Sequence, residues 1–426
     1  MDFGFRRTAV PLVPALISAL GLILIIFSPD LLWLWLGWEI AGLGVWLGLR
    51  QRGRWLAVAL NAPGWVLLAV LLLGLGRPFA PPAGGVAEAW PLAVTVAFGV
   101  VALMRSGCWP FNCWLRIAWV DSGWGGATLL GVYVLAAPIL LAKALVAAPW
   151  DPAGTWVLVL LGTVGLLGGA TASISLSGEA RVPAIASAHV GAAMVGFGLA
   201  PGSPVAAAGA VALLLSGALW VLTLGGVRGR GWLAVAGAWS TLLGGSLGAW
   251  AIAQGALDLG YGLVAVLLLP AGALIALSVT RLDGGAKSNI AARGVLAAWS
   301  LFGAALLVFM GVYPQAVMEW VVRPVVGLMA GGVGALTSVH SEWGVGIMAR
   351  SAEETIQAAL PATGMALGVA LALVVLYWLG LLLRRFVPGE AAPEPSAEGT
   401  SLSMEDVLPG AETVGRWLDP ASWFAR

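Results

Sequence analysis

Three ionisable side chains lie inside long apolar runs of the sequence, and these residue types could handle charge or protons there. Glu39 stands in the middle of one run and is the only acidic residue so placed. Arg105 ends a second uncharged run, and His189 lies within an Ala- and Gly-rich run. An ionisable group deep in a bilayer is costly unless it is paired or hydrated. Each of the three therefore indicates a proton path, an ion pair or a satisfied structural contact.

The local sequence leaves two roles open for each residue. Glu39 fits either a neutral glutamic acid bonded to a neighbouring helix or a group in a proton path or ion pair. Arg105 is its natural partner, because Gly107 and Pro110 follow and are typical of a broken helix that lines a cavity. The alternative for Arg105 is an interfacial cation. His189 fits a proton relay or a packing residue.

The remaining candidate residues give weaker indications of a functional site. Lys143 is a secondary candidate for a proton path, and its long side chain is expected to reach the membrane interface. Cys108 and Cys113 lack the nearby His or further Cys of a metal site, which favours a role as small apolar residues. The glycine-rich stretches follow no strand, as a dinucleotide site would require. We expect no catalytic residue, no metal and no cofactor.

The elements that position these residues are predicted to be membrane-spanning helices. Of 426 residues, 60% are hydrophobic and 10% are charged, against roughly a quarter charged in a soluble domain. This composition excludes a soluble enzyme and makes the lipid bilayer a partner. The net charge of +1 excludes the basic surface that nucleic-acid binding needs, so we expect no nucleic acid partner.

The apolar runs predict about twelve spans, each long enough to cross a hydrocarbon core of ~30 Å. They are Thr8–Phe27, Leu31–Leu49, Trp55–Leu75, Trp90–Trp109, Gly125–Ala148, Thr155–Leu176, Val182–Leu199, Val205–Gly225, Trp232–Ala253, Gly262–Thr280, Val295–Val312 and Ala362–Leu383. With the N-terminus in the cytoplasm, every Lys and Arg falls on that side except Arg77, Lys143, Arg323 and Arg350. We expect a multi-pass protein of the inner (cytoplasmic) membrane with both termini cytoplasmic.

Two regions fit no simple span. Tyr313–Pro361 contains a polar, helix-prone segment around Arg350 that is predicted to lie along the membrane surface. Pro388–Arg426 is rich in Pro, Ser and Glu, which predicts a flexible cytoplasmic tail. Its apolar end, Thr413–Phe424, fits either a docking site for a soluble partner or an interfacial membrane anchor.

Several stretches, taken in order, resemble the antiporter-like, proton-conducting subunits of complex I, membrane-bound hydrogenases and Mrp-type antiporters. Residues 30–49, DLLWLWLGWEIAGLGVWLGL, are similar to the family's fifth helix with its intramembrane glutamate. Residues 105–115, RSGCWPFNCWL, resemble the break in its seventh helix, and RVPAIASAHVGAAMVGFGLA resembles a later helix that contains His-Xaa-Gly. ALIALSVTRL and LLVFMGVYPQAV resemble the helices before its C-terminal anchor. The resemblance covers roughly Ala9–Val317.

The resemblance implies an all-α fold with two inverted five-helix repeats, each containing a broken helix, and a C-terminal anchor helix. The first repeat would be residues 1–148 and the inverted second repeat 155–282. Residues 293–385 would be C-terminal helices with a surface helix, and 386–426 the tail. The family's first three helices would be absent, and the break of the second repeat would fall within Gly244–Gly255.

The departures from the family pattern bear on activity. The lysines and histidines of the family's second half are missing, and Leu130 or a neighbour replaces the histidine of its eighth helix. Arg105 stands where the resemblance implies a central lysine. A guanidinium keeps its proton at any physiological pH, so a Glu39–Arg105 pair would be locked.

We therefore expect a non-catalytic membrane subunit of a multi-subunit, proton-translocating or redox-linked complex. Such a complex would be NADH-quinone oxidoreductase-like or hydrogenase-like, and this subunit would have reduced or lost proton transfer. Other membrane subunits are its expected partners. One alternative is a working half-channel in which Glu39 and His189 relay protons past a fixed Arg105. Another is the proton-channel half of an energy-coupled complex with a soluble enzyme, as in inorganic carbon uptake, held through the C-terminal tail.

Overall fold

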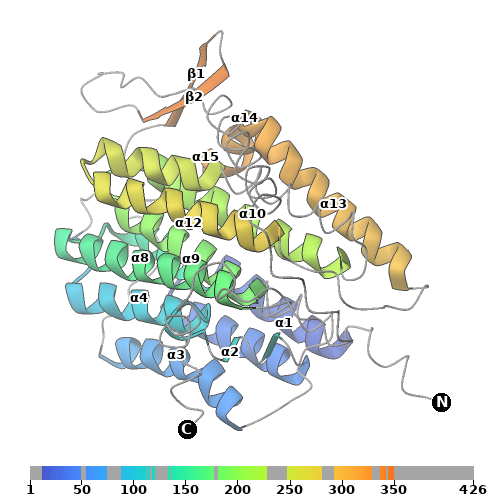
Figure 1. The fold of residues 1–426 in the computed structure, drawn as a ribbon. Helices are drawn as coiled ribbons and strands as arrows, with labels where there is room; N and C mark the ends of the chain where they lie inside the picture. Colours follow the sequence, from blue (N-terminus) through green and yellow to red (C-terminus); the bar gives the residue numbers. More distant parts are fainter. Residues whose placement is uncertain are drawn as a thin grey trace, which may run out of the picture.

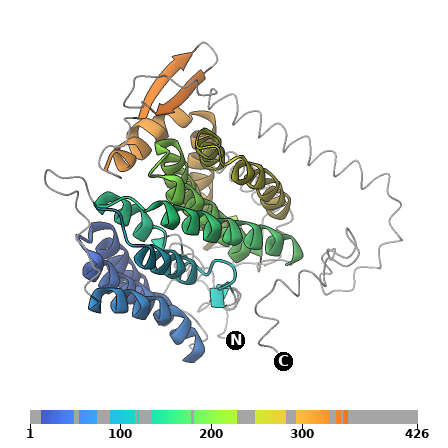
Figure 2. The same ribbon diagram turned by 90° about the vertical axis from the view of Figure 1, so that its left-hand side faces the viewer.

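The protein is described by a computed structural model over residues 12–48, 54–73, 88–112, 114–115, 118–119, 133–134, 136–176, 181–227, 247–280, 292–328, 336–341 and 344–349. This part of the chain is built from helices with one small hairpin. The chain progresses from the N-terminal helices at one end of the molecule to the C-terminal elements at the other (Figures 1 and 2).

The described elements follow one another along the chain in the order of Figure 1. They are α1 (Leu12–Phe27), α2 (Leu31–Gly48), α3 (Arg54–Leu72), α4 (Leu92–Arg105), α7 (Ile139–Ala147), α8 (Pro152–Ser175), α9 (Arg181–Leu199), α10 (Pro204–Val227), α12 (Gly262–Thr280), α13 (Ala292–Val312), α14 (Pro314–Val317), a π-helical turn (Met318–Val322), α15 (Arg323–Leu328), β1 (Leu336–Ser341) and β2 (Gly344–Ala349). Residues 247–258 are also helical.

Helix α9 lies at the centre of the helical packing, and all 19 of its residues are buried. It packs against α8 and α10, and α8 in turn packs against α4 and α12. The close approach of α8 and α9 depends on glycine: a Cβ at Gly191 would lie 2.7 Å from the carbonyl oxygen of Gly162. A helix that is apolar on all sides is typical of a protein core or a membrane.

The class of a polytopic, helical membrane protein is confirmed. Among the described residues, α2, α8 and α9 are each long and apolar enough to cross a membrane, and shorter apolar helices accompany them. The outer helices turn large apolar side chains outward, as on α1, where Val13, Leu16, Leu20, Ile23 and Phe27 are exposed. In water such a stripe would be costly, whereas in lipid it is the expected surface.

Tryptophan and aspartate fix the start of two helices. Asp151 caps α8, since its side chain accepts a hydrogen bond from the backbone N–H of Gly154 at 2.6 Å, and Pro152 follows. This is a favoured helix start. The Trp90 indole donates to the Ala144 carbonyl at 2.9 Å, which ties the entry of α4 to α7. The start of α4 is therefore held in place by the helix that precedes α8.

At two places the described residues differ from the expected local structure. Residues 247–258 are helical, so the break expected within Gly244–Gly255 is not present in its described part. The glycines there serve close packing instead, because a Cβ at Gly248 would lie 2.8 Å from the Gly209 carbonyl oxygen on α10. The span expected over Gly125–Ala148 is interrupted at Pro138, after which α7 begins. A proline cannot supply the N–H that continues a helix.

The hairpin β1–β2 was not expected from the sequence. Its antiparallel register runs from Leu336 opposite Ala349 to Ser341 opposite Gly344. The β-branched residues Thr337, Val339, Val345 and Ile347 recur at every second position in these strands, a pattern that favours a strand over a surface helix. The hairpin is a small addition to a helical fold.

Several expectations fall outside the described residues. They are the surface segment around Arg350, the span Ala362–Leu383, the tail Pro388–Arg426 with its apolar end Thr413–Phe424, and the first part of Trp232–Ala253. The number of spans and the division of the chain into two inverted repeats therefore stay predictions.

The glycine contact between α8 and α9 predicts a stability effect. Gly191→Ala should lower the free energy of unfolding by about 1–3 kcal/mol, because the added methyl group overlaps backbone atoms of α8 that cannot move independently. Thermal unfolding of the purified protein in mild detergent measures this loss. Gly272→Ala is the matched control, since a Cβ there meets nothing within 4 Å in the described structure. Equal unfolding temperatures of the two variants would contradict the prediction.

Candidate functional site

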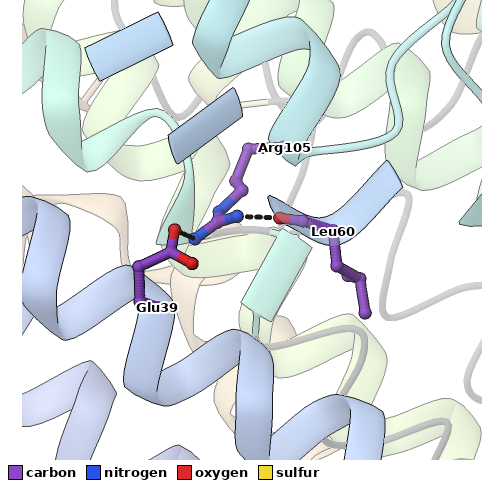
Figure 3. Close-up of polar contacts among 3 residues, drawn as sticks. All are labelled: Glu39, Leu60 and Arg105. Carbon is purple, nitrogen blue, oxygen red and sulfur yellow. Dashed lines mark hydrogen bonds and ion pairs between the residues drawn. The ribbon is translucent and has the colours of Figure 1, made fainter. Parts of the chain in front are cut away.

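Glu39 of α2 and Arg105 of α4 form an ion pair inside the helical packing. Nη2 of Arg105 donates to Oε1 of Glu39 at 3.2 Å, and Nη1 donates to the backbone carbonyl of Leu60 on α3 (Figure 3). The Arg105 side chain is 0% exposed, whereas the Glu39 side chain is 27% exposed. The two residues proposed from the sequence as partners are therefore brought together, with a third helix supplying a backbone acceptor.

Two aromatic rings also contact the guanidinium group. The Cζ atom of Arg105 lies 5.3 Å from the ring centroid of Trp38 and 5.2 Å from that of Tyr133. Both rings are buried. An arginine in such a position gains from stacking and cation–π attraction, most of all where water is excluded. The charge of Arg105 is thus stabilised by a carboxylate, a carbonyl and two aromatic faces.

Helix α3 is shaped to admit the Glu39 carboxylate. A Cβ at Gly64 would overlap Oε1 of Glu39, so any larger residue there would displace the carboxylate. Pro63 stands inside the same helix, where it removes one backbone N–H and tends to bend the helix. The Leu60 carbonyl that accepts from Arg105 lies in the turn before this proline. Gly64 and Pro63 therefore belong to the structure of the site.

Sequence reasoning missed Tyr133, Gly64 and the Leu60 carbonyl. For Tyr133 there was a weak signal, because the resemblance implies that Leu130 or a neighbour stands where the family has a histidine. Tyr133 is three positions further along and reaches the guanidinium. For Gly64 and Leu60 the sequence holds no comparable signal, since glycine is abundant in this chain and every residue has a carbonyl.

The helix break expected after Arg105 is present. Helix α4 ends at Arg105, Gly107 has a φ of +56°, and helical residues resume at position 114. This segment is bonded to α9: the backbone N–H of Trp109 donates to the Ser187 hydroxyl at 2.8 Å, and Sγ of Cys108 lies 3.2 Å from the Ser187 carbonyl oxygen. The break therefore connects the ion pair to the central helix.

His189 lies on α9, two residues beyond that anchor. Its Nδ1 is 3.0 Å from the carbonyl oxygen of Ile185, and its ring stacks on Trp220 of α10 with centroids 5.8 Å apart. Between His189 and the Glu39–Arg105 pair, no direct contact is found in the described part of the chain. His189 and the Glu39–Arg105 pair therefore belong to two separate sites.

Lys143 lies on α7 and is half-buried. Its Nζ donates to the carbonyl of Ser28 at 2.8 Å, in the connection between α1 and α2. This contact ties α7 to the connection between α1 and α2, and the reach of this side chain to the membrane interface stays a prediction. The Glu39–Arg105 pair and Lys143 are again separate among the described residues. A proton-path role for Lys143 stays a prediction.

The side chains of this site can hold a charge in a fixed position. Within the described ranges there is no group of three or more His, Cys, Asp and Glu side chains that would suit a metal ion. The site instead pairs one permanent cation with one carboxylate inside an apolar wall. What it offers is a fixed charge at the junction of three helices.

Comparison with known proteins identifies the class of fold. No protein-family model matches the chain, and no curated protein matches it by sequence. Among solved structures, it superposes on a chain of the Mrp complex from a Dietzia species with a TM-score of 0.65 and 17% identity, covering 95% of this chain and 47% of that one. The chain thus spans about half the length of that relative.

Two further structures agree. A chain of the membrane-bound sulfane sulfur reductase, an archaeal respiratory membrane complex, gives a TM-score of 0.61 at 14% identity, covering 96% of this chain and 75% of that one. A chain of respiratory complex I from Thermus thermophilus gives 0.53 at 18%, covering 72% and 78%. The chain therefore shares its fold with chains of these three complexes, which confirms the expected resemblance at the level of the fold.

The fit of Glu39 beside Gly64 predicts a coupled stability effect. Gly64→Ala should lower the free energy of unfolding by about 3 kcal/mol, because moving the carboxylate away leaves a buried guanidinium without its counter-charge. In a Glu39→Ala background the same change should cost little, since the space is already free. Thermal unfolding of the four proteins in detergent gives the coupling. Equal losses in both backgrounds would show that Gly64 does not act through Glu39.

Proposed function

We propose that the protein is a membrane subunit of a multi-subunit ion-translocating complex, in which its Glu39–Arg105 pair is a fixed electrostatic element and not a proton carrier. The cytoplasmic membrane as its location, with both termini in the cytoplasm, is part of this proposal and rests on the distribution of Lys and Arg along the chain.

The observation that carries the proposal is the complete burial of Arg105 within its set of partners. The side chain is 0% exposed, pairs with Glu39, donates to Leu60 and lies between two aromatic rings. A lysine in such a place can be tuned by burial until it exchanges its proton, whereas a guanidinium stays charged. Every contact of Arg105 also stabilises the charged form. The group is therefore suited to holding charge in place.

The pair also has a structural consequence. Glu39 belongs to α2, Leu60 to α3 and Arg105 to α4, so that one guanidinium fastens three helices at once. Such a rigid unit suits a subunit whose task is to build a membrane arm and support its neighbours. The three similar structures are all chains of large membrane complexes, and by this likeness we propose other membrane subunits as partners.

One observation favours a second function, a working half-channel. The Glu39 side chain is 27% exposed although it lies in the middle of α2, whereas that of Arg105 is fully buried. A carboxylate that is open on one side could exchange protons with a hydrated cavity or with a neighbouring subunit. In that function Glu39 would be the proton-exchanging group and Arg105 a gate charge.

Proton flux separates the two functions. Glu39→Gln keeps the shape of the side chain and a hydrogen-bond acceptor but removes the titrating group. We expect proton flux by the intact complex in proteoliposomes to stay within about twofold of the unmodified complex, a change of well under 1 kcal/mol. Asp258→Asn, which makes the same chemical change at an exposed carboxylate bonded to Gln254, is the matched control.

A large drop in flux with Glu39→Gln, but not with Asp258→Asn, would overturn the fixed-pair proposal and support the half-channel. The comparison requires that both variant complexes retain all their subunits after purification. Purification in mild detergent also tests the first part of the proposal, because recovery of the chain without any other membrane subunit would contradict its place in a complex.

A further inference from the structure

The interface of α9 and α10 holds a second pair of buried side chains that the proposed function does not use. The rings of His189 and Trp220 are nearly parallel, at 12°, with centroids 5.8 Å apart. Both residues are buried, His189 to 6% exposure and Trp220 to 1%. Stacked aromatic rings attract each other beyond the gain from burial alone. The stack therefore determines the plane in which the imidazole ring lies.

A hydrogen bond determines which nitrogen of the ring is protonated. Nδ1 of His189 is 3.0 Å from the carbonyl oxygen of Ile185, one turn earlier on α9. A carbonyl oxygen can only accept a hydrogen bond, so in this geometry Nδ1 carries the proton. In a neutral imidazole the other nitrogen, Nε2, then holds the free electron pair. Nε2 has no hydrogen-bond partner in the part of the chain that the structure describes.

The two contacts complement each other. The Ile185 carbonyl selects the nitrogen but does not prevent the ring from tilting, whereas the Trp220 indole restricts the tilt but does not distinguish the nitrogens. The backbone beneath them is also fixed, since Ser187 accepts a hydrogen bond from the N–H of Trp109 in the helix break. The plane of the ring, the nitrogen that faces Ile185 and the backbone of the helix are thus all fixed. Nε2 is then the one ring nitrogen that can accept a proton.

We propose that Trp220 is a positioning residue: by restricting the tilt of the His189 ring it preserves the bond from Nδ1–H to the Ile185 carbonyl, which leaves Nε2 as the proton acceptor. The ligand that suits such an atom is an O–H or N–H donor, such as a water molecule or a protonated side chain. The proposal is independent of the Glu39–Arg105 pair and assigns a role to a tryptophan that lies on another helix.

Nitrogen NMR of histidine tests the proposal directly. The chain has two histidines, His189 and His340, so ¹⁵N-histidine labelling with His340→Gln leaves a single imidazole. In the full chain within its complex, at alkaline pH, we expect Nδ1 to be protonated and Nε2 unprotonated. Trp220→Phe keeps an aromatic ring and should retain this spectrum. Trp220→Leu should shift the tautomer ratio about two- to tenfold toward Nε2–H, the range expected for one lost ring pair.

Two results would overturn the proposal: a majority of Nε2–H in the unmodified chain, or the same tautomer ratio in the Phe and Leu variants. If Trp220→Leu does not fold, the first result remains decisive, and a majority of Nε2–H in Trp220→Phe also counts against the proposal. A purely structural role for Trp220 would leave the tautomer ratio unchanged. The NMR measurement does not depend on proton flux. A result that overturns the role of Trp220 is therefore distinguishable from one that overturns the proposed function.

Discussion

The need to keep one guanidinium group charged inside an apolar helical packing governs the first part of this structure. Arg105 is fully buried, and an unpaired charge there would cost several kcal/mol. Its surroundings meet this demand with groups from two other helices, the Glu39 carboxylate and the Trp38 ring of α2 and the Leu60 carbonyl of α3, and with the ring of Tyr133. The bend-prone sequence at Pro63 and the missing side chain at Gly64 follow from the same demand, because both concern the space around these groups.

The parts of the site that were predictable from the sequence are those that are rare in apolar helices. Glu39 and Arg105 stood out because charge is scarce in this chain, and the break after Arg105 was recognisable from Gly107 and Pro110. Tyr133 was not predictable in its role, since an aromatic residue suits a membrane helix with or without a cation beside it. Glycine is equally ambiguous, because it permits either a helix break or a close contact between helices. At Gly248 the structure shows a close contact.

The fold was more predictable than the site, and the similar structures indicate why. Identities of 14–18% accompany TM-scores of 0.53–0.65. Helices that span a bilayer satisfy their own backbone hydrogen bonds, so many apolar sequences are compatible with one arrangement. One helical arrangement differs from another in the positions at which helices approach most closely, as at Gly162 and Gly191. Small residues at such positions leave only a weak pattern in the sequence.

The complete burial of α9 bears on how the chain enters the membrane. This helix is long and apolar enough to cross a membrane, yet all of its residues are buried by the rest of the protein. In the finished protein it meets other helices on every side. An α9 that enters the membrane along the chain must therefore exchange every lipid contact for a contact with protein, chiefly with α8 and α10, before the fold is complete.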